Sequence, residues 1–405
     1  MQKIRFHYGW LIVFAGTLSL FSCLGLARFA FGMLVPGMRD ALNLGYDQVG
    51  YLGTGNFIGY LGSVALTPVV LKYAGPRLTI LSGLLLIAVT LAGLSQATGF
   101  LPLLLLYALT GSGSGLANIS TMVLVAHWFR REKRGQAAGL IVLGNGLAII
   151  FAGFAVPLFN RLYGMDGWRI SWLVLALISL GIAVFVAAVV RNEPADLGLE
   201  PVGAPVAVAT TALQGKGSTA TGRVLLTLGL LYAAFGVTYM VYGTFVVTSM
   251  VEEYGFSEVT AGHFWSWVGF FGLFSGVLFG ALSDRIGRKY GLMVVYAVQT
   301  LAYLLIGSGL GGWALWLSVF FYGIAAFAIP AIMTAAISDY LGITKAAAGF
   351  SLITFFFAGG QTIGPAVAGV MAEAYGSFAP AFLCSAAVTA AALLFALSLP
   401  RPVEH

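Results

Sequence analysis

The sequence predicts an all-α integral membrane protein with twelve transmembrane helices in two pseudo-symmetric six-helix bundles. Charged residues make up only 8% of the 405 residues, whereas 60% are hydrophobic. An ordinary soluble domain has about 25% charged residues. Apolar runs long enough to cross a bilayer, about 20 residues each, recur along the chain, and one polar interval divides them into two equal sets. This composition excludes a water-soluble enzyme, a disordered chain and a nucleic-acid-binding protein.

The twelve predicted spans are continuous apolar runs with glycine and proline scattered through them, as is usual where membrane helices pack closely. They are 9–35, 46–71, 77–97, 100–127, 135–159, 168–190, 223–249, 258–282, 290–310, 312–338, 345–371 and 377–399. Transmembrane β-strands would instead be alternating segments of about 10 residues. Cys23 and Cys384 lie inside apolar runs, so we predict buried hydrophobic side chains and neither a disulfide nor a metal site.

The interval 191–222 is polar and rich in Pro, Gly, Ala, Thr and Ser. It is the only long non-apolar segment, and it separates six predicted spans from six others. We therefore predict an N-terminal bundle over 1–190, a cytoplasmic linker over 191–222 and a C-terminal bundle over 223–405.

The two halves contain matching short segments. Ala74-Gly75-Pro76-Arg77 and Ile286-Gly287-Arg288-Lys289 are offset by 212 residues, and Ala137-Ala138-Gly139 and Ala347-Ala348-Gly349 by 210. Two matches at nearly the same offset indicate a duplicated bundle. Transporters built from two parallel six-helix halves have this organisation.

Lysine and arginine predict the orientation of the chain. Sixteen of the 20 basic residues fall in segments on the side of the N-terminus, three fall on the other side, and Arg28 lies within a span. Because cytoplasmic loops carry an excess of Lys and Arg, both termini are predicted to be cytoplasmic. The basic charge balance is thus a topology signal and requires no nucleic-acid partner.

The segment Gly280-Ala281-Leu282-Ser283-Asp284-Arg285-Ile286-Gly287-Arg288-Lys289 follows predicted span 8. It resembles the loop signature of the major facilitator superfamily, G-x-x-x-D-R-x-G-R-[KR]. The resemblance implies the major facilitator fold, with Asp284, Arg285, Gly287 and Arg288 forming a cytoplasmic gate. An aspartate at a helix end can pair with arginine. In the N-terminal copy Lys72 stands at the aspartate position, so that half lacks the matching carboxylate.

Three further segments are similar to particular branches of this superfamily. The segment 128–139 resembles the loop between spans 4 and 5 of oxalate/formate and monocarboxylate transporters, and 192–201 resembles the segment after span 6 of bacterial organic-anion permeases. Arg28-Phe29-Ala30-Phe31 with Pro36 is similar to the first span of certain bacterial permeases. These resemblances imply an organic-anion substrate and a multi-pass protein of the bacterial inner (plasma) membrane.

Arg28 is the single clear charge inside a predicted span. A charged side chain at the centre of a membrane helix costs about 2.5–3.5 kcal/mol on insertion scales. Arg28 either extends to the outer interface or binds an anion in a central cavity, where its planar guanidinium suits a carboxylate. None of the 14 acidic residues falls at mid-membrane, which disfavours cationic substrates. A coupled proton could use His263 near the outer end of span 8, or travel with a weak acid.

Other polar residues within the spans are candidates for substrate binding, each with interhelical hydrogen bonding as the alternative. They are Asn56, Tyr60, Asn118, Thr121, Asn145, Tyr239, Tyr242, Tyr322 and Gln361. Tyr239 and Tyr242 flank Met240, which is Arg28 shifted by 212, so they are expected at the same depth in the other half. Gly111-x-Gly113-x-Gly115 is predicted to be a helix-packing motif. No Walker motif, catalytic triad or metal cluster is present, so we expect neither an enzyme nor a cofactor.

The leading hypothesis is a secondary active transporter for a small, monocarboxylate-like organic anion that works by alternating access. An efflux carrier for neutral or apolar compounds is the first alternative, with Arg28 in a structural role. A non-transporting membrane receptor is an alternative of another class. Apart from its substrate, a possible coupled proton and the lipid bilayer, we expect no partner, and nothing in the sequence indicates an oligomer, so we expect a monomer.

Overall fold

A computed structural model of the protein describes residues 7–203 and 219–400. Both chain ends and residues 204–218 of the predicted linker lie outside the described residues. The described part is helical apart from its turns and one isolated β-bridge between Phe129 and Val202. Its helices are α1 (Tyr8–Leu20), η1 (Phe21–Phe29), α2 (Phe31–Leu42), α3 (Tyr46–Ser95), α4 (Phe100–Trp128), α5 (Arg131–Tyr163), η2 (Gly164–Asp166), α6 (Gly167–Val189), η3 (Pro194–Leu197), α7 (Thr219–Glu252), α8 (Glu258–Ile286), α9 (Arg288–Gly307), α10 (Gly312–Ala325), α11 (Ala328–Leu341), α12 (Ile343–Tyr375), α13 (Ala379–Phe395) and η4 (Ala396–Ser398).

Ten helical stretches of the described residues are long and apolar enough to cross a membrane. Two of them, Tyr46–Ser95 with 50 residues and Glu132–Val189 with 58, each cover two predicted spans. Gly75 interrupts the first with φ 71°, in the left-handed region that glycine tolerates, and η2 interrupts the second. The prediction of an all-α membrane protein is therefore confirmed, and the number of twelve spans stays a prediction.

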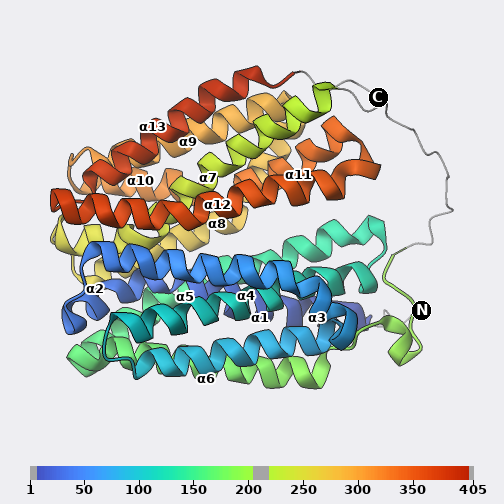
Figure 1. The fold of residues 1–405 in the computed structure, drawn as a ribbon, viewed down its shortest axis with the longest axis horizontal. Helices are drawn as coiled ribbons and strands as arrows, with labels where there is room; N and C mark the ends of the chain where they lie inside the picture. The colour runs from blue at the N-terminus through green and yellow to red at the C-terminus, as the bar shows by residue number, and fades with distance from the viewer. Residues whose placement is uncertain (1–6, 204–218, 401–405) are drawn as a thin grey trace, which may run out of the picture. The chain divides into compact units, whose positions relative to one another are not determined.

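The chain divides into two compact units. Unit 1 comprises Met1–Asn43 and Gly55–Val208, and unit 2 comprises Leu44–Thr54 and Ala209–His405. In Figure 1 the helices from α1 to α6 run from blue to green, and those from α7 to α13 run from yellow-green to red. The first turns of α3 thus belong to unit 2, where the Thr54 hydroxyl donates to the Thr362 carbonyl at 2.6 Å.

Helices within unit 1 approach one another at glycines. A Cβ atom on Gly111 of α4 would lie 1.9 Å from the Asn56 carbonyl oxygen of α3, and one on Gly115 would lie 2.0 Å from the Ser63 hydroxyl oxygen. Small residues permit such close backbone approach in membrane bundles. The prediction that Gly111-x-Gly113-x-Gly115 is a packing motif is confirmed.

Residues 191–203, which we call the strap, belong to unit 1 and pack against the junction of α4 and α5. The Phe129–Val202 bridge is flanked by bonds from Arg130 N to Val202 O and from Val202 N to Trp128 O, each 2.9 Å long. The Arg130 guanidinium also contacts the Glu200 carboxylate at 2.6 Å. The two segments 128–139 and 192–201, which are far apart in the sequence, therefore contact each other.

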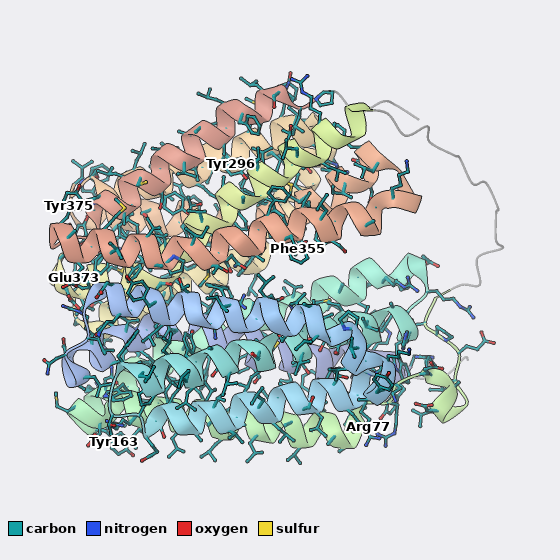
Figure 2. The ribbon with its side chains drawn as sticks, in the orientation of Figure 1. Arg77, Tyr163, Tyr296, Phe355, Glu373 and Tyr375 are labelled. Atoms are coloured by element: carbon teal, nitrogen blue, oxygen red, sulfur yellow. The ribbon has the colours of Figure 1, made fainter. Side chains whose placement is uncertain are left out.

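Asn192 of the strap stabilises the bend in α3. Its Oδ1 accepts a hydrogen bond of 2.9 Å from the backbone N–H of Arg77, two residues after Gly75. Figure 2 labels Arg77 at this end of the unit. The N–H groups of the first helical turn lack partners within their own helix, so Asn192 acts as an external cap for the second part of α3.

We expect Asn192→Ala to lower the free energy of unfolding by about 1 kcal/mol, the usual effect of losing a capping side chain. Thermal unfolding of the purified protein in detergent measures this. Asn192→Asp is the matched control, because it keeps an acceptor oxygen and should unfold close to wild type. Equal unfolding temperatures for Asn192→Ala and wild type would contradict the capping role.

Candidate functional site

Arg28 lies on η1, a nine-residue π-helical segment in the middle of the first apolar stretch. The backbone N–H of Ala30 donates to the Gly25 carbonyl at 3.1 Å, which is the i to i−5 bond of a π-helix. Gly25 packs directly on α5, since a Cβ atom there would lie 2.1 Å from Cβ of Ala148. Short π-helical segments occur frequently at functional sites. Here the widened turn carries the only arginine of the segment.

The guanidinium of Arg28 is held by two aromatic rings of α3. Its Cζ lies 4.6 Å from the ring centroid of Phe57 and 4.5 Å from that of Tyr60. Residues three apart share a helix face, so Phe57 and Tyr60 present both rings to the same cation. Cation–π contacts of this kind contribute about 0.5–2 kcal/mol each, most where the cation is desolvated.

Arg28 is only 7% exposed, and its Nε and Nη2 atoms are buried without a hydrogen-bond partner. No carboxylate of the described residues pairs with it. Nε and Nη2 form one edge of the guanidinium, and two donors on one edge match the two oxygens of a carboxylate. A buried charge without a counter-charge is costly. The burial is also the opposite of what an arginine extending to a lipid–water interface would show.

Tyr60 and Asn118 extend this region from α3 and α4. The Asn118 side-chain amide donates to the Tyr60 hydroxyl oxygen at 2.8 Å, and both side chains are half-buried. The structure thus brings Tyr60 next to Arg28 and places Asn118 beside Tyr60.

The other polar candidates of unit 1 bond to the backbone or lie buried. Asn56 donates to the Tyr107 carbonyl at 3.0 Å, which joins α3 to α4. The Thr121 hydroxyl donates to the Ala117 carbonyl of its own helix at 2.7 Å. Asn145 is buried on α5, and its Oδ1 has no partner.

Two aromatic residues near Arg28 were not predicted from the sequence. They are Phe57, under the guanidinium, and Tyr107, whose hydroxyl is 3.5 Å from the Arg28 carbonyl oxygen and whose ring stacks on Phe31 at 4.6 Å. Aromatic residues are frequent throughout the apolar runs, so only the three-residue spacing from Phe57 to Tyr60 could have distinguished one of them.

In unit 2 the predicted tyrosines interact with each other. The hydroxyls of Tyr242 and Ser318 are 2.9 Å apart, and the Tyr242 ring stacks on Tyr322 at 3.8 Å. The Tyr322 hydroxyl donates to the Tyr239 carbonyl at 2.8 Å. The hydroxyls of Tyr242 and Tyr322 therefore form hydrogen bonds between helices inside unit 2, which is the alternative to substrate binding named above. To bind a substrate they would have to exchange these bonds.

The remaining predicted residues of unit 2 differ in burial. Gln361 of α12 and Tyr239 of α7 are buried, whereas His263 is exposed on α8.

The predicted gate residues surround a sharp turn between α8 and α9. Gly287, with φ 90°, separates the two helices. The Arg288 guanidinium contacts the carboxylate of Asp284, and its Nε donates to Asp339 of α11 at 2.6 Å. Arg285 is exposed. Asp339 was not predicted for this cluster, because it lies 51 residues further along the chain and no local motif marks it.

The corresponding turn of unit 1 keeps the geometry, and no ion pair ties it within residues 7–203 and 219–400. Gly75 has φ 71°, but Pro76 stands where unit 2 has Arg288. One contact occurs in both units: Arg77 donates to the Ala187 carbonyl near the end of α6, and Lys289 donates to the Leu397 carbonyl in η4, each at 2.6 Å. The two units therefore share this feature of a duplicated helical bundle.

Long apolar helices that bend at glycine turns, with a buried arginine inside one of them, are features of a membrane-spanning helical bundle. Comparison with known families identifies the family of the chain. The family model described as Major Facilitator Superfamily matches residues 17–357, and the chain belongs to this family.

Relatives and solved structures agree with this membership. The hexuronate transporter of Bacillus subtilis (strain 168) is 24% identical over 400 residues, covering 93% of this chain and 92% of the relative. The multi-drug resistance efflux pump PmrA of Streptococcus pneumoniae (strain ATCC BAA-255 / R6) is 24% identical over 378 residues, covering 90% of each. The crystal structure of a D-xylose-proton symporter has a TM-score of 0.75 at 16% identity, covering 98% of this chain and 99% of that one. The last likeness shows the fold alone.

Proposed function

We propose that this protein is a secondary active transporter that moves a small organic anion, monocarboxylate-like in its charged end, across the bacterial inner membrane by alternating access. The single observation that supports the proposal is the buried Arg28, whose Nε and Nη2 have no partner while two aromatic rings hold the guanidinium. A carboxylate on that edge would satisfy both donors and neutralise the charge.

The chemistry of Arg28 favours an anion over a cation. A cationic substrate would meet a fixed positive charge at low dielectric, where like charges repel strongly. By its name, the Bacillus subtilis relative carries a hexuronate, a sugar acid with one carboxylate. That likeness extends over almost the whole of both chains.

The proposal includes the other parts of a carrier. We propose twelve spans, because two of the ten long apolar stretches are interrupted near their middles, with both termini in the cytoplasm and the chain acting as a monomer. The bundles would correspond to 1–190 and 223–405. Asp284, Arg285, Gly287 and Arg288 would form the cytoplasmic gate together with Asp339.

The predicted substrate-binding residues also remain part of the proposal. Arg28 and Tyr60 are its core. The other predicted residues are proposed to surround the substrate or to position the side chains that contact it. They are Asn56, Asn118, Thr121, Asn145, Tyr239, Tyr242, Tyr322 and Gln361. Proton coupling is proposed to occur through protonation of the weak-acid substrate, with His263 as the alternative carrier.

Counterflow into proteoliposomes that contain the purified protein tests this function. Labelled carboxylates, among them a hexuronate, are compared with their neutral amides and with organic cations of similar size. We expect saturable uptake of a carboxylate, competition by the unlabelled acid, and no uptake of the amide. Equal flux of the amide and the acid would contradict an anion carrier, and a pH gradient of either sign shows whether a proton accompanies the flux.

Efflux of neutral, apolar compounds is the second candidate function. The likeness to PmrA over 90% of each chain favours it, and so does the aromatic environment of Arg28. Efflux of apolar dyes from the same vesicles, without carboxylate uptake, would establish this alternative. Any substrate flux would exclude a non-transporting receptor.

A further inference from the structure

We propose that Tyr60, oriented by Asn118, is a specificity-determining residue that selects carboxylates with a hydrogen-bond acceptor on the carbon next to the carboxyl group. A 2-hydroxy or 2-oxo acid carries such an oxygen, and an unsubstituted fatty acid does not. This inference rests on the proposed function, because it requires a carboxylate bound to Arg28.

The hydrogen bond between Asn118 and Tyr60 fixes the role of the phenol. The Nδ2 atom of an asparagine can only donate, so at 2.8 Å the Tyr60 oxygen is the acceptor. The hydroxyl hydrogen of Tyr60 therefore remains available for another acceptor. No described residue accepts a hydrogen bond from this hydroxyl. Because the Tyr60 side chain is half-buried, water has limited access to act as the acceptor instead.

The position of Tyr60 relative to Arg28 gives this free donor a target. The guanidinium lies over the Tyr60 ring, with Cζ 4.5 Å from the centroid, and the hydroxyl projects from the edge of the same ring. Nε and Nη2 are shielded from solvent in this structure, so a carboxylate would reach this edge only after the covering side chains move. We propose that its neighbouring carbon then lies close to that ring edge. An oxygen on this carbon could then accept from the Tyr60 hydroxyl.

A purely structural role explains the neighbouring polar groups better than it explains Tyr60. Asn56 already joins α3 to α4, four residues before Tyr60, through the Tyr107 carbonyl. The Tyr107 hydroxyl points to the Arg28 carbonyl, and the Thr121 hydroxyl bonds within its helix. Tyr60 differs from these hydroxyls because its donor is unused and it contacts the unpaired cation.

Matched acids test the proposal: propanoate against lactate and pyruvate, and hexanoate against 2-hydroxyhexanoate. For wild type we expect kcat/KM in counterflow to be about tenfold higher for the substituted acid of each pair, the value of one hydrogen bond of about 1.4 kcal/mol. Tyr60→Phe should reduce this preference to less than about twofold, by lowering kcat/KM more for the substituted acid of each pair than for the unsubstituted one. Tyr107→Phe is the matched control, since its hydroxyl is used by the backbone, and it should keep the preference.

The outcomes separate this inference from the proposed function. A preference that survives Tyr60→Phe, or that is absent in wild type, overturns the role of Tyr60, while carboxylate uptake that requires Arg28 still supports the anion site. Carboxylate uptake independent of Arg28 overturns the proposed function itself. If Tyr60→Phe does not fold, the unfolding temperature of wild type is measured with each acid of a pair. A larger rise with the substituted acid supports the inference, and an equal rise with both acids overturns it.

Discussion

Arg28→Ala should abolish saturable anion uptake while the protein remains folded. Removing one partner of a buried charge pair costs about 2–5 kcal/mol, so kcat/KM for a carboxylate should fall at least about 30-fold. The unliganded variant should remain close to wild type in stability, because the loss of the two cation–π contacts is offset by removal of a buried cation whose Nε and Nη2 have no partner. Counterflow and thermal unfolding in detergent measure the two effects.

The conservative variant Arg28→Lys distinguishes charge from shape. Lysine keeps the positive charge but lacks the two-donor edge, so its uptake should lie between those of wild type and Arg28→Ala. Carboxylate uptake that persists in Arg28→Ala would contradict the anion site. A large loss of stability in Arg28→Ala would instead assign the residue to the fold, as the efflux alternative requires.

Gly25→Ala should inactivate the carrier through geometry alone. The added Cβ atom would lie 2.1 Å from Cβ of Ala148, a separation that non-bonded carbon atoms cannot adopt. Since α5 is packed along η1, either the two helices separate or the π-helical turn is lost, and Arg28 moves in both cases. We expect a loss of uptake of about tenfold or more, from a misplacement near 1 Å, together with a lower unfolding temperature.

The second-site variant Ala148→Gly provides the control for this prediction. With that Cβ removed, the nearest atom to the new methyl group is Cα of residue 148 at 3.5 Å, an ordinary contact. The double variant Gly25→Ala/Ala148→Gly should therefore recover most of the uptake and stability. Absence of recovery would show that Gly25 is needed for its backbone conformation rather than for its contact with α5.

The sequence predicted the features that depend on single residue types in an unusual place. Arg28 was identified because a charge within an apolar run is costly, and the Asp284–Arg288 turn because its spacing resembles a family signature. Asp339 could not be found in this way, since its partner Arg288 lies 51 residues away and only the packing of α11 brings them together.

The π-helical turn and the use of the tyrosine hydroxyls were also beyond the sequence. Nothing in the residues 21–29 distinguishes η1 from an ordinary α-helix, and the close contact between Gly25 and α5 appears only in the packed structure. Tyr242 and Tyr322 were predicted from their depth. The predicted depth of a residue in the membrane does not show that the Tyr242 hydroxyl forms a hydrogen bond with Ser318 or that the Tyr322 hydroxyl donates to the backbone.

The unlike turns at Gly75 and Gly287 give the two units different sensitivities to the surrounding electrolyte. In unit 2 the turn is tied by ion pairs of Arg288 with the partly exposed Asp284 and Asp339, and dissolved ions weaken such exposed pairs. In unit 1 the matching turn is tied by the neutral amide of Asn192 and by a backbone carbonyl, which respond far less to ions. A rise in salt concentration around these turns would thus loosen the turn of unit 2 much more than the turn of unit 1.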